Sequence, residues 1–343
     1  MVKINFVGDI LLGELFSSVG RGVKTKIEQG IDPFNCISNQ LKTADLNVGN
    51  LECVLSSKSN RHGIYRETMR GKPEYAKLLV DNIQIVNLAN NHVLDHGREA
   101  FLEMEGILKK NNISFFGDPE NIDNALVILT RDDTKIGFLG FDLSNKKYEE
   151  LNKIKNEINK TIIKSKASVD ILVLSIHWGL EYVESPIDWQ VIFSKDFLNS
   201  GADIIHGHHS HRFQGYIKEN RKLIMFSLGN FIFDDRRKLN CNTGIIEVNI
   251  EEKKIQSVSV IPLIINKNYQ PEFIDNNKME KKYKQLNEIC SRVYNSDSPE
   301  LENITKKYIK NSRKNHMFNR IYIVYNLTVK FYKYLPKIYS TDD

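Results

Sequence analysis

The chain has little cysteine and no long apolar run. Its cysteines, Cys36, Cys53, Cys241 and Cys290, are scattered without CxxC spacing, which indicates neither a zinc ribbon nor a disulfide framework. No segment approaches the ~20 consecutive apolar residues of a transmembrane helix. The beginning, MVKINFVGDILLGE, shows no signal-peptide pattern. We therefore predict a cytoplasmic protein, with peripheral attachment at the inner face of the membrane left open.

A strong excess of charge of one sign is also lacking. The formal net charge is +5 over 343 residues, and Lys and Asn are spread along the chain, so we expect no nucleic-acid partner. With 41% hydrophobic and 27% charged residues, the chain can bury a substantial core. The composition indicates one large globular domain, or one domain with an appendage.

Short apolar runs alternate with helical stretches, which is typical of an α/β fold. We expect a helix over 32–44, with Asp32 as its N-cap and Pro33 at its first position. Further helices are expected over 72–82, 98–111 and 185–201. Apolar runs that begin as strands occupy 3–9, 45–52, 83–92, 169–179, 202–211 and 223–231.

Five of these strands end in polar clusters. A single histidine at a strand end is more often a hydrogen-bonded structural residue than a ligand. Ligands in open α/β sheets nevertheless gather at the carboxyl ends of strands, so five clusters together indicate one site. The clusters are Asp9, Asn50 with Glu52, Asn90 to His92, His177, and IIHGHHSH (204–211), which carries His206, His208, His209 and His211.

The residue types in these clusters point to a hard or borderline metal. Carboxylates, imidazoles and an amide, without a thiolate, suit Mn, Fe, Zn, Ni or Mg. Mixed oxygen and nitrogen ligands from several loops are typical of a two-metal hydrolytic centre. We therefore expect one or two divalent ions.

Six motifs carry a family resemblance. GDILLGE, NLE, LANNHVLDHG, HWGLEY, GADIIHGHHSH and SLGNFIF resemble, in order, the motifs of the CapA (PgsA-like, PGA_cap) bacterial capsule-synthesis family. That family is similar to the calcineurin-like metallophosphoesterases. The resemblance implies a four-layer α/β/β/α metallophosphatase-like sandwich of two mixed sheets over residues 1–265. A mostly helical extension is expected over 266–343.

The resemblance also implies roles for individual residues. His92 would protonate a leaving oxygen. Leu11 stands where the superfamily usually has a histidine ligand, so the number of ions stays open. The implied metal ligands are Asp9, Glu52, Asn91, His177, His209 and His211, with His208 beside the cage and Asp95 as a hydrogen-bond acceptor behind the ligands.

For each of three further residues the sequence allows two interpretations. Arg70 could clamp an anionic substrate, or lie in a solvated loop. Glu181 could touch substrate or orient a ligand, and packing is the alternative. Asn230 could line the floor of the site or act as a buried capping residue.

The segment NRIYIVYNLTVKFYKYLPKIY ends the extension with apolar residues, tyrosines and a basic stripe. A helix over 319–337 would suit a membrane surface. The alternative is a helix packed on the core or on a second subunit. Pro336 would end or kink it.

Two classes of function follow. The first is a metal-dependent hydrolase of an anionic cell-envelope polymer or its precursor, with poly-gamma-glutamate suggested by the family name. The second is a non-catalytic scaffold of a capsule assembly or export complex that keeps the fold, because fold alone does not imply activity.

Overall fold

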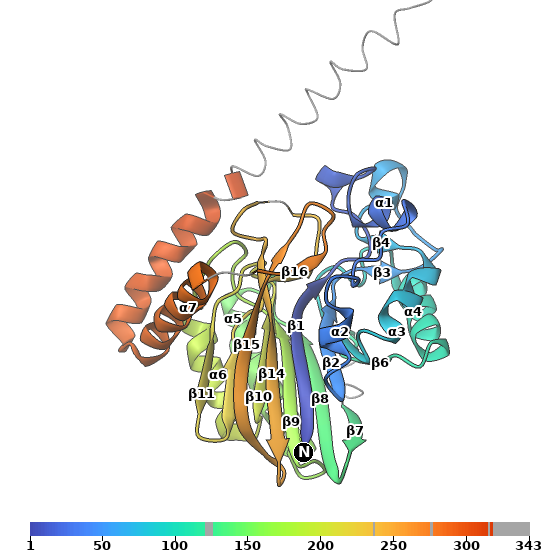
Figure 1. Cartoon of the computed structure of the whole chain (residues 1–343). Helices are drawn as coiled ribbons and strands as arrows, with labels where there is room; N and C mark the ends of the chain where they lie inside the picture. Colours follow the sequence, from blue (N-terminus) through green and yellow to red (C-terminus); the bar gives the residue numbers. More distant parts are fainter. Residues whose placement is uncertain (121–125, 236, 275–276, 315, 318–343) are drawn as a thin grey trace, which may run out of the picture.

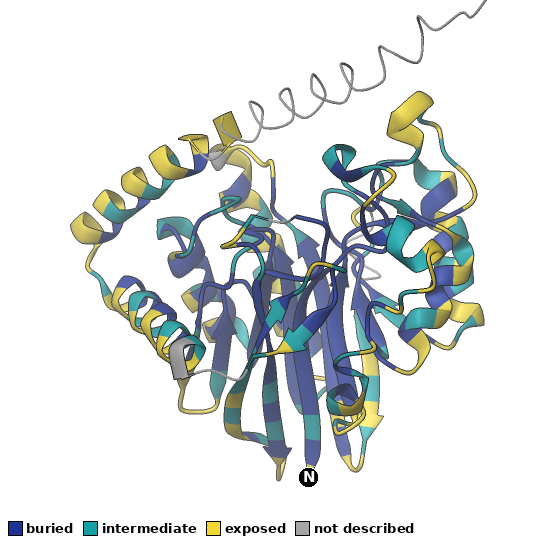
Figure 2. Cartoon of the chain, turned by 45° about the horizontal axis from the view of Figure 1, so that its top comes forward, coloured by how far each residue is buried: buried dark blue, intermediate teal, exposed yellow. Residues whose placement is uncertain are grey.

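The molecule is a sandwich of two sheets with helices on both outer faces (Figure 1). The structure, a computed structural model, describes residues 1–120, 126–235, 237–274, 277–314 and 316–317. Within these residues the strands between the helical layers are buried, and the helices expose one face each (Figure 2).

The first sheet is centred on β1 (Val2–Ile10) and has the order β16-β15-β14-β1-β2-β5-β6. β2 (Leu46–Leu51), β5 (Ile85–Asn87) and β6 (Ser114–Phe116) continue parallel to β1 on one side. On the other side lie antiparallel β14 (Asn242–Glu251), β15 (Lys254–Ile265) and β16 (Pro271–Phe273), and β13 (Asn230–Ile232) pairs with the end of β1.

The second sheet has the order β11-β12-β10-β9-β8-β7. Its four inner strands are parallel and its two edge strands are antiparallel to their neighbours. The strands are β7 (Val127–Arg131), β8 (Thr134–Asp142), β9 (Ile171–His177), β10 (Ile204–His208), β11 (Tyr216–Glu219) and β12 (Lys222–Met225), and a separate small pair is β3 (Val54–Leu55) with β4 (Arg70–Gly71).

Three hydrophobic clusters separate the four layers. One lies between the sheets, where Phe6 and Val48 of the first sheet share a cluster with Phe138 and Val173 of the second. A second joins the outer face of the first sheet to α1 (Val23–Glu28), α2 (Ser38–Leu41), α3 (Ala76–Val80) and α4 (Arg98–Lys110). A third joins the second sheet to α5 (Tyr148–Lys166) and α6 (Asp188–Ser200). The predicted α/β/β/α sandwich is therefore confirmed.

Strand register brings the predicted polar clusters to one edge. Asp9 of β1 lies opposite Asn50 of β2 and Asn230 of β13. In the second sheet, His208 of β10 lies opposite His177 of β9. Because these neighbours are parallel, their carboxyl ends meet at the same end of the sandwich.

Some predicted elements are shorter than expected. Only α2 forms within the helix expected over 32–44. The Asp32 side chain accepts a hydrogen bond from the Phe34 amide (2.9 Å), which closes a turn instead of starting a long helix. The run 223–231 supplies two strands, β12 in the second sheet and β13 in the first, with positive φ at Gly229 (68°) where the chain crosses between them.

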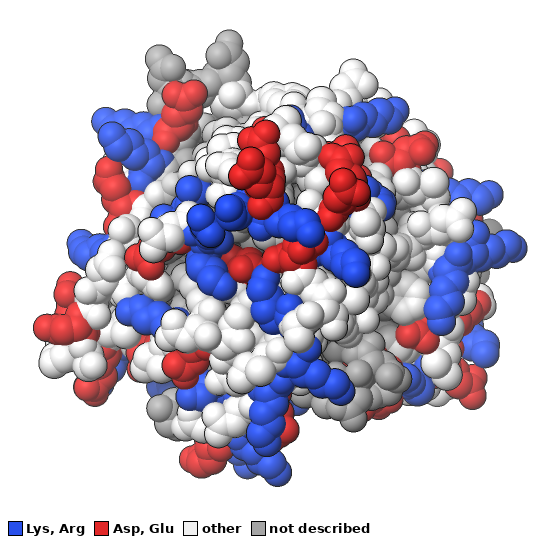
Figure 3. All heavy atoms as spheres, turned by 90° about the horizontal axis from the view of Figure 1, so that it is seen from below, with Lys and Arg blue, Asp and Glu red and all other residues white. Residues whose placement is uncertain are grey.

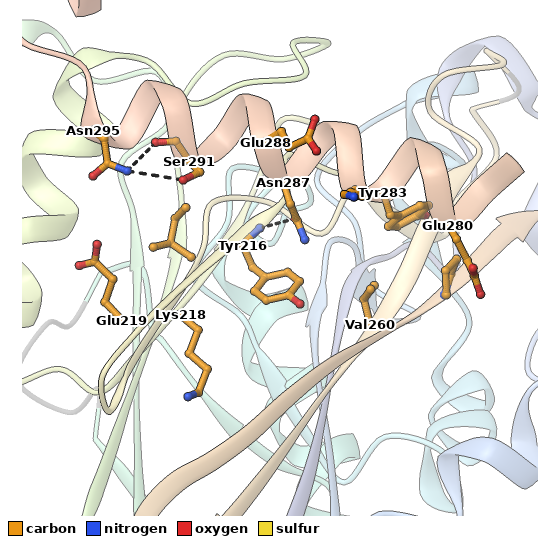
Figure 4. A pocket seen from close by; sticks show the side chains of 13 residues that line it. Tyr216, Lys218, Glu219, Val260, Glu280, Tyr283, Asn287, Glu288, Ser291 and Asn295 are labelled. Carbon is orange, nitrogen blue, oxygen red and sulfur yellow. Dashed lines mark hydrogen bonds between the residues drawn. The ribbon is translucent and has the colours of Figure 1, made fainter. Parts of the chain in front are cut away.

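The first sheet continues past the boundary expected at residue 265, because β16 pairs with β15. Beyond it, α7 (Asn277–Asn295) and a helical stretch over 298–314 pack on the core. A groove of about 660 Å³ lies between α7 and strands β11 and β15, and contains none of the strand-end clusters (Figure 4). The helix expected over 319–337 lies outside the described residues.

No helix among the described residues has both the length and the apolar character needed to span a membrane.

Candidate metal centre

Asp9, Glu52 and His211 form the tightest cluster of ligand types in the described chain. Asp9 belongs to β1, Glu52 follows β2, and His211 follows β10. One potential ligand atom from each lies within 4.8 Å of the others, and all three residues are buried. These three predicted ligands are thus brought together from three separate strand ends.

A second group of potential ligands lies close to the same Glu52 carboxylate. His177 Nε2 lies 3.9 Å from Glu52 Oε1, and His209 Nδ1 lies 3.0 Å from His177 Nε2. Two ligands bound to one ion at about 2.0–2.1 Å are roughly 3 Å apart, so this histidine spacing fits a shared ion. Without an ion, one of these two nitrogens must carry a proton and donate it to the other. A divalent cation bound between them would take the place of that proton.

Unsatisfied buried oxygens support a cation at this place. Among the described residues, Asp9 Oδ2, Glu52 Oε1 and Asn91 Oδ1 are buried without a hydrogen-bond partner. A buried polar atom without a partner costs about 1–3 kcal/mol, and more when charged. The donor set of carboxylates, an amide oxygen and imidazoles therefore fits a divalent ion of the kind the sequence predicts.

The histidine loop after β10 is held in an uncommon conformation. His209 and His211 have positive φ angles of 89° and 55°, a region that residues other than glycine rarely adopt. Such strain persists only where surrounding contacts fix it, and it is typical of functional sites. In this conformation His209 contacts His177 (3.0 Å) and His211 Nε2 lies 3.8 Å from Glu52 Oε1.

Hydrogen bonds behind the ligands orient them. Asn230 Oδ1 lies 2.9 Å from His211 Nδ1, so Nδ1 donates to the amide oxygen and Nε2 is left as the metal-binding nitrogen. His208 Nδ1 lies 3.0 Å from Asp9 Oδ1 and holds that carboxylate. Asn230 and His208, both expected near the site, thus hold one side chain of the cluster each. His206 is bonded away from it, to the Val7 carbonyl oxygen (2.9 Å).

Asn50 was placed in a strand-end cluster from the sequence, but no role was assigned to it. Its Nδ2 donates to Asp9 Oδ1 (3.0 Å), and its Oδ1 accepts from Asn87 (3.1 Å) and Asn90 (3.2 Å). Asn50 thus ties three strand ends of the first sheet together. Its place in a polar strand-end cluster was the available signal, but its side-chain partners come from other strands.

Ionisation within the cluster is uneven. Burial disfavours the Asp9 carboxylate, but His208 and His211 outweigh burial and hold the pKa of Asp9 well below its usual range. Burial also opposes the charge on His211, yet Glu52 and Asp9 raise the pKa of His211 to about 10. Burial lowers the pKa of His209 to about 4, which keeps it neutral, the form in which imidazole binds metals.

His92 lies at the edge of the cluster as one end of a hydrogen-bonded chain. Its Nδ1 is 2.8 Å from Asp95 Oδ2, and Arg61 donates to the other Asp95 oxygen (2.8 Å). His92 Nε2 lies 4.0 Å from Glu52 Oε1, and the side chain is 27% exposed. Asp95 therefore accepts from His92, and Nε2 can exchange a proton with a bound molecule.

Arg70 is turned toward protein carbonyls and not toward an incoming anion. Its guanidinium donates to the carbonyl oxygens of Arg66 (2.8 Å) and Ser56 (3.0 Å) and pairs with Glu67 (3.4 Å). The side chain is 13% exposed. These contacts argue against the predicted anion clamp, because the donors are already used inside the loop.

Glu181 lies near the imidazoles, as expected for a residue beside the site. Burial disfavours its charge, but His211 and His209 outweigh burial and lower the pKa of Glu181. Its Oε2 lies 3.6 Å from Nε2 of His316, so the C-terminal extension reaches this edge of the centre. Leu11, in the position of the usual first-motif histidine, is buried in the apolar core of the first sheet and offers no ligand atom.

Comparisons with known proteins agree with the predicted family. The capsule biosynthesis protein CapA of Bacillus anthracis is 26% identical over 311 residues, covering 85% of this chain and 74% of that protein. The PGA biosynthesis protein CapA of Bacillus subtilis (strain 168) is 26% identical over 280 residues, covering 78% and 72%.

A solved structure of a novel phosphatase from Mycoplasma pneumoniae has a TM-score of 0.44 and 14% identity, covering 83% of this chain and 98% of that one. The sequence model of the family described as bacterial capsule synthesis protein PGA_cap matches residues 3–235. That match spans well over half of the chain, and the chain therefore belongs to the PGA_cap family of bacterial capsule synthesis proteins.

Proposed function

We propose that this protein is a metal-dependent hydrolase that acts on an anionic cell-envelope polymer, or its precursor, during capsule biosynthesis. The observation that carries the proposal is the convergence of the unpartnered Asp9 and Glu52 oxygens with His211 in a buried cluster. Without a metal ion this buried carboxylate pair depends on the charge of His211 for compensation, and a divalent cation would take over that role.

The ligands divide into two overlapping sets. Asp9, Glu52 and His211 would hold one divalent ion, and Glu52 with Asn91, His177 and His209 would hold the other. Divalent ions bound in such sets lower the pKa of water and neutralise charge on the reacting oxygens. The protein supplies the fixed geometry, because Asn50, Asn230 and His208 hold the ligands in place.

His92 is the residue that we assign to proton transfer. Asp95 holds its Nδ1–H and leaves Nε2 directed toward the ligand cluster. An imidazole held in this way can give a proton to a leaving oxygen or nitrogen. Its partial exposure (27%) is consistent with this role because the group must meet substrate.

The substrate class is drawn from the relatives. The Bacillus subtilis relative is a PGA biosynthesis protein, and the Bacillus anthracis relative is a capsule biosynthesis protein. We propose poly-gamma-glutamate or its precursor as the first substrate to test, with phosphoesters of cell-envelope polymers as the second. Both are anionic and suit a site whose metal ions are positively charged.

A non-catalytic scaffold is the second candidate, and one observation favours it. Leu11 fills the place of a usual ligand, which leaves the Asp9 set with three protein ligands. A site with fewer ligands binds its ion more weakly. A scaffold would need the fold and the polymer contacts but not a water-activating ion.

The two candidates differ in a hydrolysis assay. Protein reconstituted with Mn, Fe or Zn is incubated with gamma-glutamyl oligomers and with p-nitrophenyl phosphate and its diester. The hydrolase predicts turnover that a chelator abolishes and that Asp9→Asn lowers strongly, while Asn5→Ala, which alters a buried amide at the other end of β1, retains it. Absence of turnover with every metal and substrate would favour the scaffold.

A further inference from the structure

A group of cations lies directly beside the metal centre and is not used by the mechanism above. Arg212 follows the ligand His211 in the chain. The guanidinium carbon of Arg237 lies 3.6 Å from the centre of the Tyr182 ring, and that ring stacks on His211 with centroids 5.8 Å apart. Arg237 is therefore separated from a metal ligand by one aromatic ring.

Asn240 joins the two arginines. It accepts a hydrogen bond from Arg212 Nε (3.1 Å) and donates to Asp235 Oδ2 (2.7 Å), and Asp235 also pairs with Arg237. Asp235 thus satisfies Arg237. Among the described residues, Arg212 has no carboxylate within 4 Å, so its terminal guanidinium nitrogens are available to a ligand.

Lys282 of α7 belongs to the same group, because its neighbouring charges are Glu184, Lys238 and Arg212. Burial lowers the pKa of Lys282; among the neighbouring charges Glu184 has the largest effect and raises it, while Lys238 and Arg212 lower it. Lys282 is half-buried, and no carboxylate lies within 4 Å of it in the described chain. A half-buried ammonium beside other cations is unfavourable unless an anion compensates it.

We infer that these cations form a subsite for the carboxylates of a polyanionic chain that extends from the metal centre toward α7. The inference rests on the proposed function for its polymer substrate. We call the residues the Arg212 subsite; they are Arg212, Arg237, Lys238 and Lys282, interspersed with the carboxylates Glu184 and Asp235.

The interspersed carboxylates indicate the charge density of the ligand. The subsite contains four cationic and two anionic side chains, so its net charge is positive. A chain with one carboxylate per repeat can place its charges between Glu184 and Asp235. A polyphosphate of the same length carries its charges closer together, so more of them would lie near Glu184 and Asp235 and be repelled. Arginine suits either anion by bidentate hydrogen bonding, so the experiment includes both.

The test is binding of a fluorescent gamma-glutamate oligomer to the full chain in a chelator, measured by anisotropy. Without metal no hydrolysis occurs, so binding is measured separately from catalysis. The variant is Arg212→Gln with Lys282→Gln. The control is Lys218→Gln with Arg221→Gln, which removes the same charge from exposed residues beside the β11–β12 turn. Figure 3 views the molecule from that end, where Lys and Arg alternate with Asp and Glu.

We expect the Arg212 subsite variant to bind the oligomer about tenfold or more weakly, because it loses charge-assisted hydrogen bonds. The control variant should bind within about twofold of wild type, and both should unfold at the wild-type temperature.

Equal loss in both variants, unchanged binding in the subsite variant, or no binding by wild type would overturn the inference. Tighter binding of a polyphosphate of equal length would overturn its assignment to carboxylates. Binding with the expected pattern, but no hydrolysis after metal is restored, would reject the proposed function alone.

Discussion

Replacing Asn230 with alanine should weaken metal binding without touching a ligand. His211 Nδ1 lies 2.9 Å from Asn230 Oδ1 and 3.6 Å from Asp9 Oδ2. Without the amide oxygen, the buried Nδ1–H can be satisfied only by turning toward Asp9. That movement would take Nε2 away from Glu52 and use an Asp9 oxygen that should bind the ion.

The expected magnitude follows from similar partners in other metal sites. Loss of a hydrogen bond behind a histidine ligand costs about 10–100-fold in metal affinity, or about 1.4–2.7 kcal/mol. The assay is competition with a chromophoric chelator for Zn or Mn. The control is Asn5→Ala, which removes a buried amide hydrogen bond (2.9 Å to Asn47) from the other end of β1 and should lower stability alone. Affinity within twofold of wild type in Asn230→Ala would refute the reasoning.

Three further predictions concern other residues. His92→Asn should lower hydrolysis by about 10²–10⁴-fold at unchanged metal content, as checked by kinetics and elemental analysis; loss of metal would instead make His92 a ligand. Arg70→Gln should lower the free energy of unfolding by about 1–3 kcal/mol and leave KM unchanged, because its donors bind carbonyls; a raised KM would restore the anion clamp. Burial raises the pKa of Asp234 to about 7, against hydrogen bonds from Ser18 and Leu15, so folding favours its protonated form. Wild-type stability should then fall as pH rises from about 4 to about 7, and denaturant unfolding of Asp234→Asn should lack this part of the fall.

Strand ends were the part of the site that the sequence could predict. An apolar run followed by a polar cluster marks where a buried strand reaches the surface, and parallel strands carry such ends to one edge. Asp9, Glu52, His177 and His211 were found in this way, and the structure brings them together. The apolar runs likewise predicted β1, β2, β5, β9, β10 and, as a single run, β12 with β13, which are half of the described strands of the two sheets.

Contacts between residues that lie far apart in the sequence could not be predicted from it. A guanidinium such as that of Arg70 can face a ligand or a carbonyl oxygen, and only the path of its loop decides which. β8 was not predicted because Gly137 and Gly140 interrupt its apolar run. The Asn50 hydrogen bonds and the crossing of 223–231 between sheets depend on strand order, which local pattern does not specify.

The central claim is that the strand-end cluster binds a divalent metal, and elemental analysis tests it most directly. Protein purified without chelators or a histidine tag is compared with His209→Ala and with His62→Ala, which removes an exposed histidine. The account predicts about one or two equivalents of transition metal in wild type and in His62→Ala, and a clear loss in His209→Ala. Wild-type protein that holds no metal, even after reconstitution with Mn, Fe or Zn, would contradict it.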